Sequence, residues 1–314
     1  MKVLISGGAG FIGSHMVAYY LNQGAEVWCV DNLLTGSESN LAPYAVFPNF
    51  HFLRLDVADL KEEHLPADFN LVCHLASPAS PPEYLKYPLE TMRVNSAGTE
   101  KMLSLAQKAQ ARFLYSSTSE VYGDPEVPVQ REDYWGHVNP VGPRSVYDEA
   151  KRFGEALTMA YHRCYGVNTG IARIFNTYGP GMKLNDGRVI PNFISQALSG
   201  RPLTVYGEGS QSRSFCYIDD LVRGLVLLAD SGEHWPVNLG NPEEFTVKQL
   251  VEKMSQVLGR PLKVEFKPLP EDDPKRRKPD ISRAQRILGW QPQISLEEGL
   301  RKTINHFQKI IGRS

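Results

Sequence analysis

Two groups of polar residues in this sequence could together remove a proton from a substrate hydroxyl. Residues 118–120, Thr-Ser-Glu, follow an apolar run at 112–115, so we expect them at the end of a buried strand. Tyr147 and Lys151 lie four residues apart in a helical pattern, which places both side chains on one face about a turn apart. A phenol beside an ammonium group and a hydroxyl is a candidate general base.

Tyr147 needs a positive neighbour to act as a base, because the pKa of a free tyrosine is near 10. Lowering that pKa by about three units requires on the order of 4 kcal/mol of preferential stabilisation of the phenolate. The Lys151 ammonium, about 6 Å away at an effective dielectric of about 20, would supply roughly 3 kcal/mol. An oxidised nicotinamide ring, itself cationic, could supply the remainder. We therefore expect the pair to form a base beside a nicotinamide dinucleotide, with Thr118 holding the same hydroxyl in line.

The N-terminal segment has the pattern of a dinucleotide-binding unit. An apolar strand at 2–6 leads into glycines spaced G-x-x-G-x-x-G, then a helix over about 11–23 and a second strand at 26–30. Glycines at such a turn let the backbone approach a pyrophosphate, which the helix N-terminus faces. Asp31 follows the second strand, where a carboxylate bonds ribose hydroxyls and repels a 2′-phosphate. The pattern therefore predicts NAD rather than NADP.

Alternating strands and helices continue to about residue 178 and become less regular beyond it. The proline-rich segment 77–82 is expected to be neither helix nor central strand, because three prolines remove donors and fix φ. It could be a rigid connector or a wall of a sugar pocket. The helix at 88–110 has an apolar face that includes Leu89 and Met92, and the helix carrying Tyr147 has one that includes Phe153. Further strands are expected at 51–55, 69–76, 111–117 and 167–174.

The C-terminal part is expected to contain shorter elements. The basic run at 275–278 is expected in a loop before a proline. Helices are predicted at 189–198 and 221–228, strands at 203–206, 212–217 and 237–240, and three closing elements at 246–258, 282–288 and 295–311.

Composition excludes several functional classes. The 314 residues are 42% hydrophobic and 22% charged, with a net charge of −1, so no bulk field recruits nucleic acid or an anionic membrane. No apolar stretch approaches the roughly 20 residues needed to span a bilayer. We expect a cytoplasmic protein with no nucleic-acid, membrane or metal partner. The four cysteines are predicted to be buried reduced thiols, and His74 a satisfied core residue rather than a ligand.

The glycine spacing and Asp31 resemble the extended branch of the short-chain dehydrogenase/reductase superfamily, which acts on nucleotide sugars. The resemblance implies an α/β fold: a doubly wound, Rossmann-like parallel sheet with a smaller α/β C-terminal substrate domain. It implies an NAD-binding domain at 1–178, to which about 218–240 returns, and a UDP-sugar-binding domain at 179–314. The residues implied to hold NAD are Gly7, Gly10, Phe11, Ile12, Gly13, Asp31, Asn32, Thr35, Gly36, Asp56, Val57, Leu75, Ala76, Ser77, Asn95, Tyr147 and Lys151.

The residues beside Thr118 separate the reactions that can follow oxidation of a sugar C4 hydroxyl. A 4,6-dehydratase needs an acid to expel the C6 hydroxyl, and Ser119 is far too weak an acid. A 4-epimerase only rotates the keto sugar and needs no carboxylate at position 120. A decarboxylase acts on a C5 carboxylate that lies β to the new ketone, and the enolate left behind must be protonated at C5. Glu120 could position a water or carry that proton.

Four longer strings resemble the UDP-glucuronic acid decarboxylases, also called UDP-xylose synthases. They are TSEVYGDP (118–125), YWGHVNP (134–140), RIFNTYGP (173–180) and DDPKRRKPD (272–280). The resemblance implies NAD-dependent decarboxylation of UDP-glucuronate to UDP-xylose through a 4-keto intermediate, with NAD recycled, in a homodimer. One departure is Gly181, where the family usually has Arg, which puts a local polar contact in doubt.

The resemblance also implies roles for individual residues. Arg277 would hold the sugar acid, and Glu120 would aid decarboxylation or reprotonation. The implied catalytic set is Thr118, Ser119, Glu120, Tyr147, Lys151 and Arg277. The implied substrate-binding set is Ser80, Asn176, Arg188, Val189, Asn192, Thr204, Tyr206, Arg213 and Arg277.

Other functions remain open on the sequence. A different nucleotide-sugar enzyme, a 4-epimerase or a 4,6-dehydratase, would share the oxidation machinery, and related oxidative decarboxylases stop at the 4-keto pentose. A non-catalytic NAD-binding regulator is disfavoured, because it need not keep Thr118, Tyr147 and Lys151 together.

Overall fold

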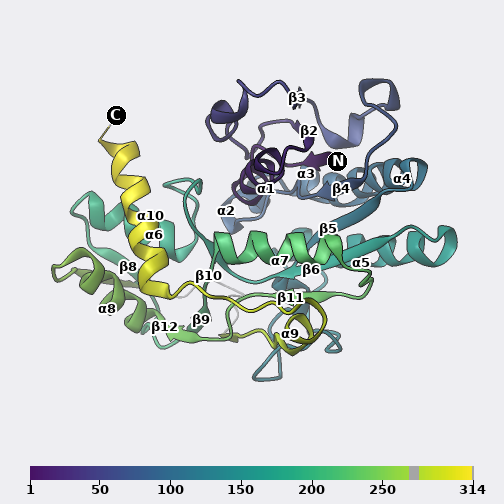
Figure 1. The fold of residues 1–314 in the computed structure, drawn as a ribbon. Helices are drawn as coiled ribbons and strands as arrows, with labels where there is room; N and C mark the ends of the chain where they lie inside the picture. The colour runs from purple at the N-terminus through teal and green to yellow at the C-terminus, as the bar shows by residue number, and fades with distance from the viewer. Residues whose placement is uncertain (269–275, 313–314) are drawn as a thin grey trace.

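A seven-stranded parallel sheet forms the centre of the N-terminal part (Figure 1). The structure is a computed structural model that describes residues 1–268 and 276–312. The strand order is β11-β6-β5-β4-β1-β2-β3. The strand order therefore reverses between β1 and β4, and parallel sheets open a ligand crevice at such a point. The strands are β1 (Lys2–Ser6), β2 (Glu26–Asp31), β3 (Phe50–Arg54), β4 (Leu71–His74), β5 (Arg112–Thr118), β6 (Thr169–Ile174) and β11 (Val237–Leu239).

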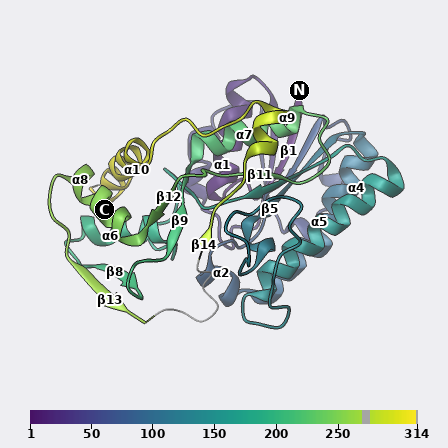
Figure 2. The same ribbon diagram turned by 90° about the horizontal axis from the view of Figure 1, so that it is seen from below.

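Helices cover both faces of this sheet (Figure 2). Val3 and Ile5 pack into one core and Leu4 into another, because side chains alternate along β1. Coverage on both sides explains the uninterrupted apolar runs in the sequence. The predicted doubly wound α/β fold is confirmed. The first face carries α1 (Phe11–Asn22) and α7 (Ile218–Asp230), and the second carries α4 (Thr99–Ala109) and α5 (Ser145–Tyr165), with α3 (Pro88–Arg93) packed against α5.

A smaller α/β region lies beside the sheet and contains α6, α8 and α10 (Figure 1). Its strands form three small sheets, β10-β7, β12-β9-β14 and β13-β8. The strands are β7 (Thr177–Tyr178), β8 (Leu203–Tyr206), β9 (Ser212–Ser214), β10 (Cys216–Tyr217), β12 (Glu244–Thr246), β13 (Val264–Lys267) and β14 (Arg276–Arg277). The helices of the C-terminal part are α6 (Val189–Leu198), α8 (Val247–Leu258), α9 (Ser282–Leu288) and α10 (Leu296–Ile311).

The proline-rich segment differs from its predicted form. Pro81 and Pro82 begin α2 (Pro81–Lys86), so the expectation that 77–82 excludes helix was wrong at its end. Proline is compatible with the first helical turn because the N–H groups there have no intrahelical partner. The predicted single helix at 88–110 is interrupted by a π-helical turn, η5 (Val94–Gly98), between α3 and α4.

Two further predictions in the C-terminal part are corrected. The strand expected at 212–217 consists of two short strands, β9 and β10, that belong to different sheets. Arg277 lies in β14 rather than in a loop, and its backbone pairs with Arg213 of β9. Residues 272–275, the first part of the DDPKRRKPD string, lie outside the described residues.

The burial of single side chains tests the predictions made for them. His74 is buried, and its two ring nitrogens make hydrogen bonds with Ser6 Oγ (2.7 Å) and Val94 O (3.2 Å), which confirms the core interpretation. All four cysteines are free thiols, but Cys164 is exposed, contrary to the prediction that all are buried. Leu89, Met92 and Phe153 are exposed as well, on the neighbouring helices α3 and α5. In the described ranges 1–268 and 276–312, no helix has the length and apolar character needed to cross a membrane.

Candidate active site

A groove of about 380 Å³ lies at the carboxyl ends of β1, β2 and β4, at the crevice between β1 and β4. Fourteen of the seventeen residues predicted to hold a dinucleotide line it, whereas Asn95, Tyr147 and Lys151 do not. Asn95 lies behind the wall, where its Nδ2 donates to Ser77 Oγ (2.9 Å) and its Oδ1 accepts from Tyr115 (3.2 Å). The fourteen are Gly7, Gly10, Phe11, Ile12, Gly13, Asp31, Asn32, Thr35, Gly36, Asp56, Val57, Leu75, Ala76 and Ser77.

The local geometry of this groove fits a dinucleotide. Gly7 has φ of +75°, and a Cβ on it would lie 2.6 Å from Ala76 N, so only glycine allows the close turn. The two oxygens of Asp31 accept from the backbone N–H of Ala9 (3.0 Å) and Leu33 (2.8 Å), which fixes the carboxylate at the end of β2. Ser80 Oγ is buried in the wall and has no hydrogen-bond partner among the described residues.

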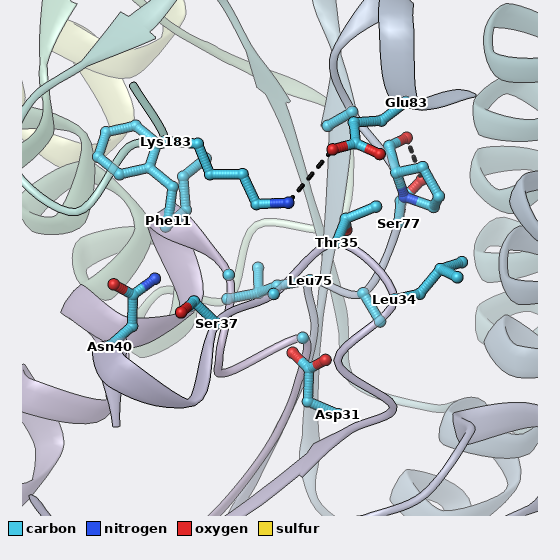
Figure 3. A pocket seen from close by; sticks show the side chains of 18 of the residues that line it. Phe11, Asp31, Leu34, Thr35, Ser37, Asn40, Leu75, Ser77, Glu83 and Lys183 are labelled. Atoms are coloured by element: carbon cyan, nitrogen blue, oxygen red, sulfur yellow. Dashed lines mark hydrogen bonds and ion pairs between the residues drawn. The ribbon is translucent and has the colours of Figure 1, made fainter. Parts of the chain in front are cut away.

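An ion pair crosses the mouth of the groove. Lys183 Nζ lies 3.2 Å from Glu83 Oε1, and the two side chains point toward one another in Figure 3. Asp31 lies below Thr35 and Leu75 in the same view. The segment carrying Lys183 thus meets α2 over the dinucleotide groove.

A second cavity, of about 540 Å³, adjoins the groove and contains every residue of the predicted catalytic set. The two spaces share part of their walls, including Ile12, Leu75 and Ser77. Molecules bound in the two spaces would therefore contact one another. β5 and α5 supply Thr118, Tyr147 and Lys151 to the second cavity.

Thr118, Tyr147 and Lys151 form the part of this cavity that is built from β5 and α5. The side chain of Thr118 hydrogen-bonds that of Tyr147 and also accepts from Glu120 N (3.2 Å). Lys151 Nζ lies 5.9 Å from the Tyr147 ring centroid and donates to Ser116 O (2.8 Å). The i, i+4 spacing on α5 therefore puts both side chains on the cavity wall.

In the protein alone, burial decides the charge of both groups. Burial, and then the Glu120 charge, raise the pKa of Tyr147, while hydrogen bonding to Thr118 opposes the rise. Burial lowers the pKa of Lys151 to about 7, although the Glu155 charge opposes it. The expected lowering of the Tyr147 pKa is therefore not produced by Lys151 alone. The prediction also required a second cation, the oxidised nicotinamide ring, to stabilise the phenolate.

Glu120 is held between two guanidinium groups at the other end of the cavity. Its Oε1 accepts from Arg277 Nη1 and its Oε2 from Arg144 Nη2, both at 2.6 Å. Burial would raise the pKa of Glu120, but Arg277 and then Arg144 outweigh it and hold that pKa well below the usual range. Glu120 is therefore an anion in the protein alone, and its expected role, to position a water or to carry a proton, stays a prediction.

Asp148 follows Tyr147 on α5 and is buried. Its side chain hydrogen-bonds that of Glu120, and its Oδ1 has no hydrogen-bond partner among the described residues. Burial, and then the Glu120 charge, raise the pKa of Asp148 to about 8, while Arg277 and Arg144 oppose the rise. Two guanidinium groups thus surround two carboxyl groups of which one is ionised and the other is mostly protonated near neutral pH.

Eight of the nine predicted substrate-binding residues line this second cavity. Ser80 does not, because it lies in the wall of the dinucleotide groove. Arg188 is held by Asp186, to which its Nη2 donates at 2.7 Å. The eight are Asn176, Arg188, Val189, Asn192, Thr204, Tyr206, Arg213 and Arg277.

Sequence reasoning missed three residues at this site. Arg144 ends a long loop, and no spacing rule connects it with Glu120. Asp148 adjoins Tyr147 on α5, so an acidic neighbour of the predicted base was the available signal. Tyr84 of α2 stacks on Tyr147 with ring centroids 5.0 Å apart and planes 3° from parallel. Helix was excluded at 77–82 on the sequence, so the start of α2, which carries Tyr84, was not predicted.

Comparison with known proteins places these features in a wider family. Residues 3–240 match the model of the NAD dependent epimerase/dehydratase family. Among curated relatives, UDP-glucuronic acid decarboxylase 1 of Xenopus tropicalis is 50% identical over 308 residues, which cover 98% of this chain and 72% of the frog protein. UDP-glucuronic acid decarboxylase 1 of Arabidopsis thaliana is 49% identical over 311 residues, which cover 99% and 71% of the two chains.

Solved structures with the same fold include sugar-nucleotide epimerases. UDP-glucose 4-epimerase of Thermotoga maritima, determined with UDP-glucose, has a TM-score of 0.89 and 30% identity, covering 99% of this chain and 100% of the other. UDP-glucuronic acid 4-epimerase of Bacillus cereus, in complex with UDP-glucuronic acid and NAD, has a TM-score of 0.88 and 28% identity, with the same coverage.

Proposed function

Because the chain belongs to the NAD dependent epimerase/dehydratase family, we propose that it decarboxylates UDP-glucuronate to UDP-xylose through a 4-keto intermediate, with NAD recycled. The observation that carries the proposal is the position of Arg277, whose side chain lines the second cavity and donates to Glu120 at 2.6 Å. A sugar carboxylate that entered this cavity would meet a guanidinium group that can bind it.

NAD, when bound, supplies the acceptor for the C4 hydrogen. In our proposal Tyr147 takes the proton of the C4 hydroxyl, Thr118 holds that hydroxyl in line, and Lys151 favours the phenolate. Arg277 orients the sugar carboxylate, since a guanidinium can bind a carboxylate with two N–H groups. Once C4 is a ketone, the C5 carboxylate is that of a β-keto acid and leaves as carbon dioxide. Ser119, at the start of η6 (Ser119–Tyr122), lines the cavity near this carboxylate.

The two parts of the chain divide the binding in this proposal. Residues 1–178, with the returning segment at about 218–240, hold NAD, and residues 179–314 hold the UDP-sugar. The two cavities support this division, because the first is lined mainly by the N-terminal part and the second draws on β8, β9 and α6. Asp31 favours NAD over NADP because a carboxylate repels a 2′-phosphate.

We also propose that the protein is a cytoplasmic homodimer. The exposed Leu89, Met92 and Phe153 on α3 and α5 support a subunit interface, since apolar side chains gathered on adjacent helices gain from burial. Four free thiols, one of them exposed, suit a reducing compartment. Phe153→Glu should convert the dimer to a monomer in light scattering, whereas Ile287→Glu, on α9, should not. A wild-type monomer contradicts the homodimer.

The decisive experiment identifies the product of UDP-glucuronate. Purified protein with catalytic NAD should yield carbon dioxide and UDP-xylose, with no net reduced nicotinamide, as measured by NMR and absorbance. UDP-galacturonate as the product would make the protein a 4-epimerase. Accumulation of reduced nicotinamide with a 4-keto pentose would make it an oxidative decarboxylase. Either result would overturn the proposal.

A further inference from the structure

The reaction proposed above consumes one proton from outside the substrate. When the bond between C5 and its carboxylate breaks, carbon dioxide leaves and the electron pair remains in the C4–C5 enolate. C5 must then gain a proton before the ketone is reduced. The proton that Tyr147 takes from the C4 hydroxyl cannot serve, because it returns to the C4 oxygen on reduction. A separate group must therefore hold the C5 proton.

Glu120 lies in the cavity wall but cannot store this proton by itself. Both of its oxygens accept hydrogen bonds from guanidinium groups, Arg277 and Arg144, at 2.6 Å. These contacts favour the ionised form of a carboxyl group. Glu120 can still pass a proton, because a carboxylic acid that readily ionises is a strong donor.

Asp148 is placed to store the proton that Glu120 cannot. It is 7% exposed, lies outside the walls of the cavity, and hydrogen-bonds Glu120. Two carboxyl groups in such contact cannot both remain ionised without a large electrostatic cost, so they tend to share one proton. The two arginines bind Glu120, and the Oδ1 of Asp148 has no partner among the described residues, which leaves Asp148 as the protonated member.

We propose that Asp148 is a positioning residue that holds the proton destined for C5 and passes it through Glu120. This inference rests on the proposed decarboxylation. In the first step the Asp148 O–H bond breaks and the proton moves to Glu120. In the second, Glu120 gives a proton to C5 of the enolate and returns to its carboxylate form. Solvent then reprotonates Asp148, so the cycle consumes one proton and releases one carbon dioxide.

Among Asp148 and the titratable groups that face it, Asp148 is the one whose pKa lies near neutral pH. They are Glu120 of η6, Arg144 before α5, Arg277 of β14, Tyr84 of α2 and Tyr147 of α5. The pKa of Glu120 lies well below the neutral range, and the pKa values of both arginines and both tyrosines lie above it. Burial, and then Glu120, raise the pKa of Asp148 to about 8.

The test separates oxidation at C4 from protonation at C5 by following reduced nicotinamide in a single turnover with UDP-glucuronate. Asp148→Asn keeps a polar neutral group beside Glu120 but has no proton to release. We expect reduced nicotinamide to form at nearly the wild-type rate and to decay at least about tenfold more slowly, since proton transfer contributes roughly 10²–10⁴-fold to catalysis. More 4-keto pentose should escape from the variant than from the wild type.

The pH profile distinguishes proton storage from a structural role. In the wild type the decay of reduced nicotinamide should slow as the pH rises through about 8, where Asp148 loses its proton. In Asp148→Asn this dependence should disappear. The control is Glu149→Gln, which removes the adjacent carboxylate that pairs with Arg152 (3.5 Å) and should behave as wild type. A variant with the wild-type decay rate and pH profile, or one that forms no reduced nicotinamide, overturns the proposal.

An infrared titration tests the stored proton without turnover. The wild type at about pH 7 should show the band of a protonated carboxyl group, and Asp148→Asn should lack it. A spectrum without that difference overturns the proposal. If the wild type releases no carbon dioxide from UDP-glucuronate, the proposed function fails, while the infrared difference still decides whether Asp148 holds a proton.

Discussion

The two ends of the second cavity differ in the charge state of their side chains. At one end Tyr147 and Lys151 come from a single helix, and burial favours the neutral form of each, with the Lys151 pKa at about 7. At the other end Glu120, Arg144 and Arg277 come from three separate segments and keep their charges because each has a partner. The first end, which we call the oxidation end, needs a further cation to favour the phenolate. At the second, the carboxylate end, two guanidinium groups already pair with Glu120.

This difference assigns the generic and the specific chemistry to different ends. Oxidation of a C4 hydroxyl requires the oxidation end whatever the sugar carries at C5. Recognition of a C5 carboxylate and its replacement by a proton require the carboxylate end. Changes at the first end should therefore affect all nucleotide sugars alike, whereas changes at the second should affect sugar acids alone.

The largest effect is expected for Tyr147→Phe, which removes the proposed base. Formation of reduced nicotinamide from either UDP-glucuronate or UDP-glucose should fall by about 10²–10⁴-fold, the usual contribution of general base catalysis. Binding of NAD, measured by fluorescence titration, should remain within about twofold of wild type and serves as the control for folding. Unchanged turnover would falsify the assignment of Tyr147 as the base.

Lys151 gives a pH dependence that the carboxylate end does not share. Burial lowers its pKa to about 7, below that of a lysine in the unfolded chain. Between about pH 7 and 10.4 the unfolded chain therefore holds a proton that the folded protein has released, so this group makes the free energy of unfolding rise with pH. The rise over that interval is on the order of 4 kcal/mol.

Lys151→Met removes this contribution. Its gain in stability over the wild type should be largest near pH 7 and should shrink as the pH rises toward about 10. Urea unfolding of both proteins at several pH values measures the difference. Parallel stability curves for the two proteins would mean that Lys151 keeps an ordinary pKa.

Arg277→Ala should separate the two ends. It leaves Glu120 with Arg144 alone and removes the proposed contact with the sugar acid, which at about 1.5–3 kcal/mol corresponds to roughly 10–150-fold weaker binding of UDP-glucuronate. Binding of UDP-glucose, measured by calorimetry, should change far less. Lys278→Ala is the matched control, since Lys278 pairs with Glu244 (3.2 Å) outside the cluster. Equal losses for both sugars would show that Arg277 is not the carboxylate clamp.

The oxidation end could be predicted from the sequence because its geometry is local. The i, i+4 spacing of Tyr147 and Lys151 fixes their shared face, and the strand before Thr118 fixes its end position. The glycine turn and Asp31 were predictable for the same reason, since a strand, a turn and a helix are continuous in the chain. Six strands of the sheet followed from repeated apolar runs, and the return of β11 to it was implied by the family resemblance.

The carboxylate end could be predicted only in part, because it depends on contacts between distant segments. Arg277 is 157 residues from Glu120, and only a family resemblance connected the two. Arg144 and Asp148 required the packing of the loop and α5 against η6. The start of α2 was not predicted because helix was excluded at the prolines. Proline is, however, compatible with the first turn of a helix.

Tyr84 tests the boundary between the two ends, and its effect should be the smallest. Its ring stacks on Tyr147, and its charge environment includes Glu120 and Arg144. Tyr84→Leu loses the stacked pair, worth about 1 kcal/mol, so kcat/KM should fall about fivefold for UDP-glucuronate and UDP-glucose alike. Tyr84→Phe keeps the stack and removes a buried hydroxyl that has no hydrogen-bond partner among the described residues, so its activity should match wild type. A loss in Tyr84→Phe equal to that in Tyr84→Leu would show that the hydroxyl, rather than the ring, joins the two ends.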